Sequence, residues 1–166
     1  MDDVVVVGAG PAGNNAALTL AKNGFKVSVF DSRSEIGNKL CTGIIGTECS
    51  DKFPISESFV YSAPKSAKLI TPDNDSLEFS VAYPQAKIVD RVSYVNSFAN
   101  QAMDAGARYH LEENVLDLEP HGYGVQVKTT NGIYESKAVI ISAGFSSSLT
   151  QKVGPVSYTH LRAHET

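Results

Sequence analysis

One glycine pattern near the start of the chain constrains its fold more than any other feature: Gly8, Gly10 and Gly13. It follows the apolar run VVVV at 4–7, which is typical of a parallel strand buried on both faces. Pro11 stands where a helix would begin, because proline lacks the N–H that the first helical position leaves unbonded. Alanines and leucines continue the helix as far as Asn23-Gly24. The segment therefore predicts a strand, a tight glycine turn and a helix.

Each glycine has its own physical role in such a turn. Gly8 permits the sharp bend, Gly10 lets the backbone approach a diphosphate, and Gly13 allows the helix to pack closely on the strand. The amides and dipole at the helix start favour the phosphate charge. Asp31 ends the next predicted strand, 25–30, where its carboxylate can accept hydrogen bonds from ribose hydroxyls and would repel a 2′-phosphate. This pattern predicts a dinucleotide site, although spacing alone leaves FAD and NAD open and a turn without a ligand is the alternative.

The rest of the chain departs from a plain doubly wound dehydrogenase. Between Ser32 and about Pro64 a sequence rich in glycine and serine predicts a loop in place of the expected helix. An N-cap at Asp90 predicts a helix to about Ala105, stopped by Gly106. Further strands are predicted at 67–71, 77–83, 87–89, 115–118, 124–129, 133–135 and 138–142. The order predicts an α/β fold: a truncated Rossmann-like FAD/NAD(P)-binding domain with a mostly parallel central sheet and a β-meander crossover.

The domain organisation follows from these elements and from the end of the chain. We expect residues 1–154 to form the N-terminal part of the cofactor-binding domain, with about 53–89 contributing to a substrate-domain sheet. The last residues, VSYTHLRAHET, read as the in-frame translation of a transposase-type sequencing adapter. We therefore expect 155–166 to be a non-native tail and the natural sequence to continue beyond the break. His160 and His164 lie in this tail, so we assign no metal ligands there or elsewhere.

Composition and charge exclude several classes of protein. A net charge of −4 gives no basic surface for nucleic acid. No apolar run approaches the roughly 20 residues that a membrane-spanning helix needs, and the first run leads into a turn instead of a signal-peptide cleavage site. Cys41 and Cys49 match no common zinc spacing and are expected to be free thiols. We expect a cytoplasmic protein.

Three segments resemble FAD-dependent oxidoreductases. DVVVVGAGPAG at 3–13, with FDSR at 30–33, resembles the opening of the large group that includes aromatic-ring hydroxylases. GNKLCTGII at 37–45 is similar to the Lys-x-Cys-x-Gly region of geranylgeranyl reductases, and VDRVSYVNSFANQAMDAGA at 89–107 resembles the Arg-led helix of that family. The resemblance to the geranylgeranyl reductase family covers about 3–153.

The resemblance implies an FAD site with residues in particular roles. The glycine turn would line the pyrophosphate, Asp31 would hold the adenosine ribose, and Arg33 would lie near the adenine end. Leu40 and Cys41 would lie nearer the flavin ring, although Cys41 could equally be a small residue in a glycine-rich loop. The implied cofactor-binding residues are Gly8, Gly10, Pro11, Ala12, Gly13, Asp31, Ser32, Arg33, Leu40, Cys41, Arg91, Val115, Ala143 and Gly144.

Several of these positions have a second interpretation. Arg91 would face the cofactor and Val115 would contact adenine through its backbone. Arg33 and Arg91 could instead be solvated surface cations, and Val115 could simply pack in a strand. The family usually carries an Asp after the last meander strand, but this chain reads Ser142-Ala143-Gly144-Phe145-Ser146, which weakens the assignment of cofactor contacts there.

The activity that the resemblance implies is an FAD-dependent reduction. Reduced flavin would deliver a hydride from N5 to a carbon–carbon double bond of a geranylgeranyl isoprenoid chain. The catalytic residues would lie beyond the break, so the chain alone is expected to be inactive. A lipid substrate would allow peripheral membrane contact, while the electron donor and oligomeric state stay open. The alternatives are an FAD-dependent monooxygenase of the aromatic hydroxylase type and a cofactor-free prenyl-binding escort module.

Overall fold

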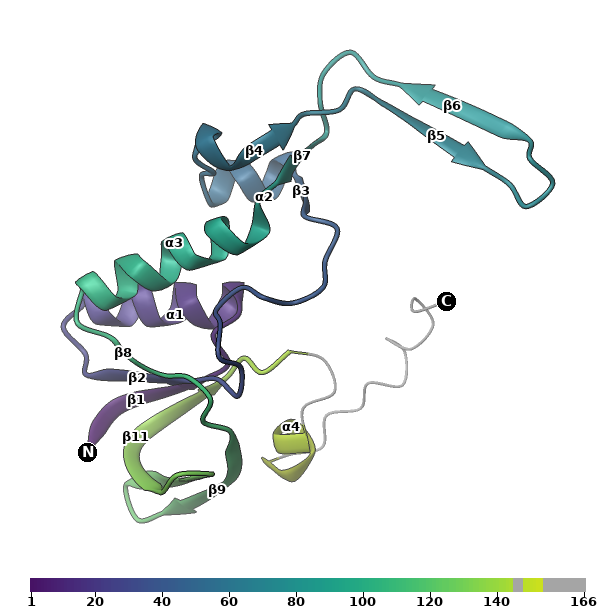
Figure 1. Ribbon diagram of the computed structural model, residues 1–166. Coiled ribbons are helices and arrows are strands. Elements are labelled where there is room, and N and C mark those ends of the chain that lie inside the picture. The colour runs from purple at the N-terminus through teal and green to yellow at the C-terminus, as the bar shows by residue number, and fades with distance from the viewer. Residues whose placement is uncertain (145–147, 154–166) are drawn as a thin grey trace. The chain divides into compact units, whose positions relative to one another are not determined.

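The computed structural model describes residues 1–144 and 148–153 in two compact units (Figure 1). Unit 1 contains residues 1–36 and the described residues from 98 onward, and unit 2 contains 37–97. Each unit is described by itself. The predicted adapter tail at 155–166 lies outside the described residues, as do Phe145 and Ser146.

Unit 1 is built on a six-stranded sheet in the order β8-β2-β1-β11-β10-β9. Its strands are β1 (Asp2–Val7), β2 (Val27–Phe30), β8 (Arg108–His110), β9 (Val115–His121), β10 (Gly124–Thr129) and β11 (Ile133–Ile141). Strand β1 pairs in parallel with β2 and β11, and β2 pairs in parallel with β8. Strand β10 runs antiparallel to both β9 and β11. This arrangement confirms the predicted α/β fold with parallel strands and a β-meander.

Strand β1 is the centre of the unit 1 core because Val4–Val7 are buried on both faces. Helix α1 (Pro11–Lys22) packs on β1 and β2. On the face of β1 and β2 away from α1, buried side chains of these strands pack against β9, β10 and α4 (Ser148–Val153). The buried residues of that second layer are Val5, Val7, Phe30, Val115, Leu118, Val127 and Leu149. Burying each such side chain stabilises the fold by about 1.5–3 kcal/mol, so β1 holds the glycine turn on a rigid strand.

Helix α3 (Arg91–Asp104) begins and ends at the predicted signals. The Asp90 carboxylate accepts hydrogen bonds from the Ser93 amide (3.0 Å) and hydroxyl (2.7 Å), which confirms the predicted N-cap. Gly106 adopts a φ of 101°, and the Ala107 amide donates to the Ala102 carbonyl at 2.9 Å. This left-handed conformation is the reason that glycine ends the helix here.

Unit 2 corrects the predicted loop between 32 and about 64. A three-stranded antiparallel sheet has the order β3-β7-β4, with β3 (Ile44–Gly46), β7 (Ala86–Val89) and β4 (Val60–Ser62). Helix α2 (Thr47–Lys52) and the 3₁₀ turn η1 (Glu57–Phe59) lie between β3 and β4 in the chain. Strand β7 confirms the strand predicted at 87–89. The elements that the prediction missed, β3, α2, η1 and β4, all lie inside the segment that its glycine and serine content predicted as a loop. The strands predicted at 67–71 and 77–83 are confirmed as β5 (Ser66–Ile70) and β6 (Ser76–Ser80), which pair as an antiparallel hairpin.

Strand β11 corrects a second prediction. The sequence predicts separate strands at 133–135 and 138–142, but one strand runs through both. Its first half pairs with β10 and its second half with β1, and Ser136 stands at the change. The buried Ser136 hydroxyl donates to the Ala138 carbonyl at 2.7 Å, so a polar residue interrupts the apolar pattern without ending the strand. No described helix is long and apolar enough to cross a membrane.

Candidate cofactor site

The glycine turn between β1 and α1 is closely packed at two glycines and open at the third. Gly8 has a φ of 105°, and a Cβ there would lie 2.5 Å from the Ser142 carbonyl oxygen. A Cβ at Gly13 would lie 1.9 Å from the Gly8 carbonyl oxygen, whereas one at Gly10 would meet no described atom within 4 Å. The open space therefore lies beside Gly10, where the spacing predicts that a diphosphate approaches the backbone.

The start of α1 offers amide donors to this space. Gly10 is the N-cap and makes no side-chain capping bond, and Pro11 is the first helical residue. The first helical hydrogen bond runs from the Asn14 amide to the Gly10 carbonyl at 2.9 Å. The Ala12 and Gly13 amides precede it and have no acceptor within the helix. Together with the helix dipole, this arrangement fits an anionic diphosphate.

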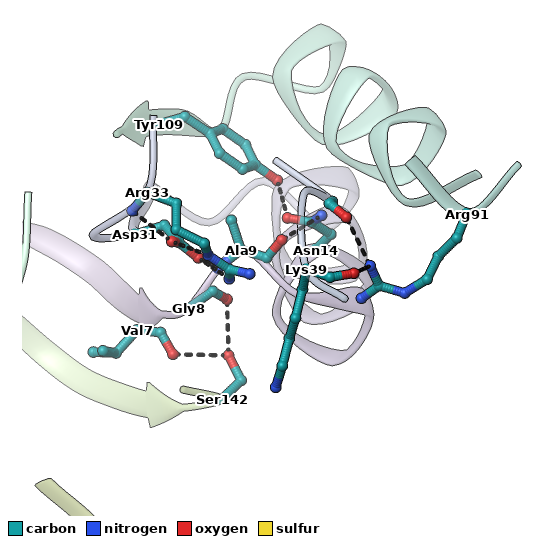
Figure 2. Close-up of polar contacts among 11 residues, drawn as sticks. Val7, Gly8, Ala9, Asn14, Asp31, Arg33, Lys39, Arg91, Tyr109 and Ser142 are labelled. Carbon is teal, nitrogen blue, oxygen red and sulfur yellow. Dashed lines mark hydrogen bonds and ion pairs between the residues drawn. The ribbon is translucent and has the colours of Figure 1, made fainter. Parts of the chain in front are cut away.

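Asp31 follows β2 directly and lies buried beside the turn (Figure 2). Its Oδ2 accepts from the Ala9 amide at 2.8 Å and from Arg33 Nη2 at 2.8 Å. Its Oδ1 accepts from the Arg33 amide at 3.0 Å and from Arg33 Nε at 2.9 Å. A carboxylate has about four acceptor positions, so this set fills them. Ribose hydroxyls can therefore bond Asp31 only when the Arg33 guanidinium moves aside.

The charge of Asp31 is maintained by these partners. Burial alone would raise the pKa of the carboxyl, but the hydrogen bonds from Arg33 and Ala9 outweigh it and hold the pKa below its usual range. The bond to Asp31 in turn raises the pKa of the Arg33 guanidinium. Arg33 is thus an ion-pair partner of the predicted ribose ligand, with its side chain 38% exposed. The neighbouring Ser32 is exposed.

The neighbouring strand β11 supports the turn through a residue that the sequence did not indicate. Ser142 follows β11, and its hydroxyl donates to the carbonyls of Val7 (3.0 Å) and Gly8 (3.1 Å). The Ser142 amide also donates to the Val7 carbonyl at 2.8 Å. Ala143 and Gly144, which we expected to line the cofactor, follow as exposed residues. A serine 134 positions away carries no local signal for this contact.

Val115 begins β9, and its side chain is buried in the same core cluster as Val5, Phe30 and Leu149. The structure thus gives the side chain a packing role. The predicted backbone contact with adenine stays a prediction.

The remaining predicted residues belong to unit 2. Arg91 Nη1 donates to the carbonyls of Gly37 (2.7 Å) and Lys39 (2.9 Å), so it fixes the loop that precedes β3 (Figure 2). Leu40 and Cys41 follow in that loop as exposed residues. A hydrogen bond from the Gly43 backbone, with a smaller contribution from the Arg91 charge, holds the pKa of the Cys41 thiol below its usual range. Their orientation toward a flavin stays a prediction.

Comparison with known proteins gives this geometry a family context. Residues 2–163 match the family model described as pyridine nucleotide-disulphide oxidoreductase. An uncharacterised protein encoded upstream of nifH2 in Methanosarcina barkeri is 33% identical over 90% of this chain and 86% of its own length. Digeranylgeranylglycerophospholipid reductase from Methanothrix thermoacetophila is 35% identical over 70% of this chain, which spans 31% of that enzyme.

Solved structures agree on the fold. A geranylgeranyl bacteriochlorophyll reductase-like protein from Thermoplasma acidophilum has a TM-score of 0.76 at 25% identity, covering 92% of this chain and 42% of its own. The p-nitrophenol 4-monooxygenase from Pseudomonas putida reaches a TM-score of 0.74 at 19% identity, over 93% of this chain and 44% of its own, and shows the fold alone. These matches confirm the predicted resemblance, the fold class and FAD as the cofactor. The chain spans less than half the length of the named reductases that it matches.

Proposed function

Because the chain belongs to the pyridine nucleotide-disulphide oxidoreductase family, we propose that it supplies the FAD-binding part of an enzyme that reduces isoprenoid double bonds. The substrate would be a geranylgeranyl chain carried by a lipid. The observation that carries this proposal is the open glycine turn beside the buried Asp31, in a chain similar to named digeranylgeranylglycerophospholipid reductases.

The residues of this chain would bind and orient the cofactor. The amides of Ala12 and Gly13 would hold the diphosphate, and Asp31 would accept from the ribose once Arg33 has moved. When bound and reduced, FAD supplies the hydride that a carbon–carbon double bond accepts. We propose that the loop containing Leu40 and Cys41, fixed by Arg91, lies toward the flavin ring.

The domain boundaries form part of the same proposal. Residues 1–154 would belong to the cofactor-binding domain, about 53–89 would join a substrate-domain sheet, and 155–166 would be a non-native tail. The reductase would act in peripheral contact with the membrane that holds its lipid substrate.

The test is reduction of a defined lipid by the protein in which residues 1–154 are continued by the uninterrupted gene. The purified protein is loaded with FAD, reduced without oxygen, and mixed with vesicles containing digeranylgeranyl glycerophospholipid. Mass spectrometry should show two hydrogens gained for each double bond reduced. The Gly10→Ala variant provides the control, since its added methyl occupies the space for the diphosphate.

Two results would contradict the proposal. A yellow, FAD-loaded protein that hydroxylates a phenol in the presence of oxygen, and leaves the lipid unchanged, would favour the monooxygenase alternative. A colourless protein that rejects added FAD would favour the prenyl-binding module.

A further inference from the structure

Asn14 and Tyr109 form a chain of hydrogen bonds that ends at the glycine turn and that the sequence did not predict. Asn14 lies in α1 with its side chain fully buried, and Tyr109 lies in β8. The Tyr109 hydroxyl meets Asn14 Oδ1 at 3.0 Å, and Asn14 Nδ2 meets the Ala9 carbonyl at 3.1 Å (Figure 2). The three groups form a connected path from the sheet, through the helix, to the turn.

Chemistry fixes the direction of each bond in this path. A backbone carbonyl can only accept, so the amide nitrogen of Asn14 must be the group that faces Ala9. The amide oxygen of Asn14 then faces Tyr109, whose hydroxyl must donate. Burial raises the pKa of the Tyr109 hydroxyl well above its ordinary value, so the hydroxyl keeps this proton across the whole working range of pH.

The path determines which way the next backbone amide points. Ala9 and Gly10 share one planar trans peptide, in which the C=O and the N–H point in opposite directions. Because Asn14 draws the Ala9 carbonyl inward, the Gly10 N–H points away from Asn14. The preceding peptide is fixed separately, since the Ala9 amide donates to Asp31 at 2.8 Å. Two consecutive peptides of the turn are thus held by side chains from outside it.

We propose that Tyr109 and Asn14 are positioning residues that aim the Gly10 amide at the diphosphate of the cofactor. Tyr109 acts through Asn14, and neither side chain touches the ligand. The inference rests on the cofactor part of the proposed function and is independent of the isoprenoid substrate. ADP serves as the probe, because it carries the diphosphate and the adenosine for which unit 1 provides the glycine turn and Asp31.

The experiment measures ADP affinity by calorimetry for the 166-residue chain and its Tyr109→Phe variant. Phenylalanine keeps the ring and removes only the donor to Asn14. Loss of one buried hydrogen bond should weaken ADP binding by about fivefold. The amide signal of Gly10 in a ¹H–¹⁵N spectrum of the ligand-free chain should shift or broaden, because its peptide is no longer held in one orientation.

Two further variants separate positioning from loss of stability. Tyr94→Phe is the matched control, since the Tyr94 hydroxyl donates to the Phe53 carbonyl at 2.9 Å within unit 2. It should leave ADP affinity and the Gly10 signal unchanged. In an Asn14→Leu background, Tyr109→Phe should cause no further loss of ADP affinity, because its route to Ala9 has already been removed.

The proposal is overturned if Tyr109→Phe binds ADP as well as the wild type, or if Tyr94→Phe loses as much affinity. It is also overturned if the losses of Tyr109→Phe and Asn14→Leu add, or if the wild-type chain binds no ADP at millimolar concentration. An unchanged affinity for ADP in Tyr109→Phe would leave the reductase proposal standing. A failed lipid assay would equally leave this inference standing.

Discussion

Arg33 covers the carboxylate of Asp31 with two parallel hydrogen bonds, from Nε at 2.9 Å and from Nη2 at 2.8 Å. The carboxylate that the sequence assigns to a ribose is therefore occupied by a side chain two residues away. This pairing keeps a buried carboxylate charged until a ligand replaces the guanidinium.

Replacing Arg33 should raise the pKa of Asp31. Desolvation persists in Arg33→Gln while the strongest compensating bonds are lost, so the pKa moves up from its lowered position. Carbon-13 NMR of the Asp31 carboxyl should show a titration midpoint below 3.8 in the wild type and a higher one in the variant. Lys137→Gln, which removes the partner of Asp3, is the control and should leave Asp31 unchanged.

The same substitution should alter stability in a defined range of pH. A pKa lowered by folding means that the charged form stabilises the folded chain. That contribution is complete above the unfolded pKa, near 3.8, and is lost as the pH falls through the folded value. The free energies of unfolding of wild type and Arg33→Gln, measured with urea, should differ most above about pH 4 and become equal in stronger acid. A difference that grew toward acid would contradict this sign.

Two glycine substitutions should separate an effect on stability from an effect on ADP binding. In Gly13→Ala the new Cβ lies 1.9 Å from the Gly8 carbonyl, so the helix must shift and stability should fall by about 1–3 kcal/mol. In Gly10→Ala no described atom lies within 4 Å, so stability should stay within about 0.5 kcal/mol. ADP binding should nevertheless be lost in Gly10→Ala, as measured by calorimetry beside urea unfolding. A Gly10→Ala chain that binds ADP normally would place the diphosphate elsewhere.

Asp31 should distinguish adenosine ligands by their ribose. The wild type should prefer ADP to 2′-deoxy-ADP by about tenfold, because hydrogen bonds to a charged group are the stronger kind. Asp31→Asn should reduce that preference, whereas Asp2→Asn, at a buried carboxylate paired with Arg108, should not. Adenosine 2′,5′-bisphosphate should bind more weakly than ADP. Tighter binding would mean that Arg33 recognises a 2′-phosphate.

The β5–β6 hairpin should promote self-association of the chain. Ala67 pairs with Phe79 and Leu69 with Leu77, so one face of this two-stranded hairpin is apolar, and all four residues are exposed. Leu77→Lys should raise the highest concentration at which the chain is still monomeric in sedimentation velocity. Its unfolding free energy should change by less than about 0.5 kcal/mol. Glu78→Lys, on the other face, should not have this effect on association.

Local patterns predicted those parts of the molecule whose signals lie close together in the chain. The glycine turn, α1, the Asp90 cap and the β5–β6 hairpin each follow from a few neighbouring residues. Within unit 2, β3, α2, η1 and β4 were missed because they lie in a segment whose glycine and serine content indicates a loop. Contacts such as Tyr109 with Asn14 depend on strand order, which no local pattern encodes.

The bond from Ser142 to the Gly8 carbonyl has a consequence for synthesis of the protein. A ribosome completes β1 and α1 long before it reaches β11, so until β11 has been made β1 has a neighbouring strand on one side only. Until residue 142 leaves the exit tunnel, the bend at Gly8 lacks the serine that holds it. The bend between β1 and α1 is therefore held from the β11 side only after the meander has been made.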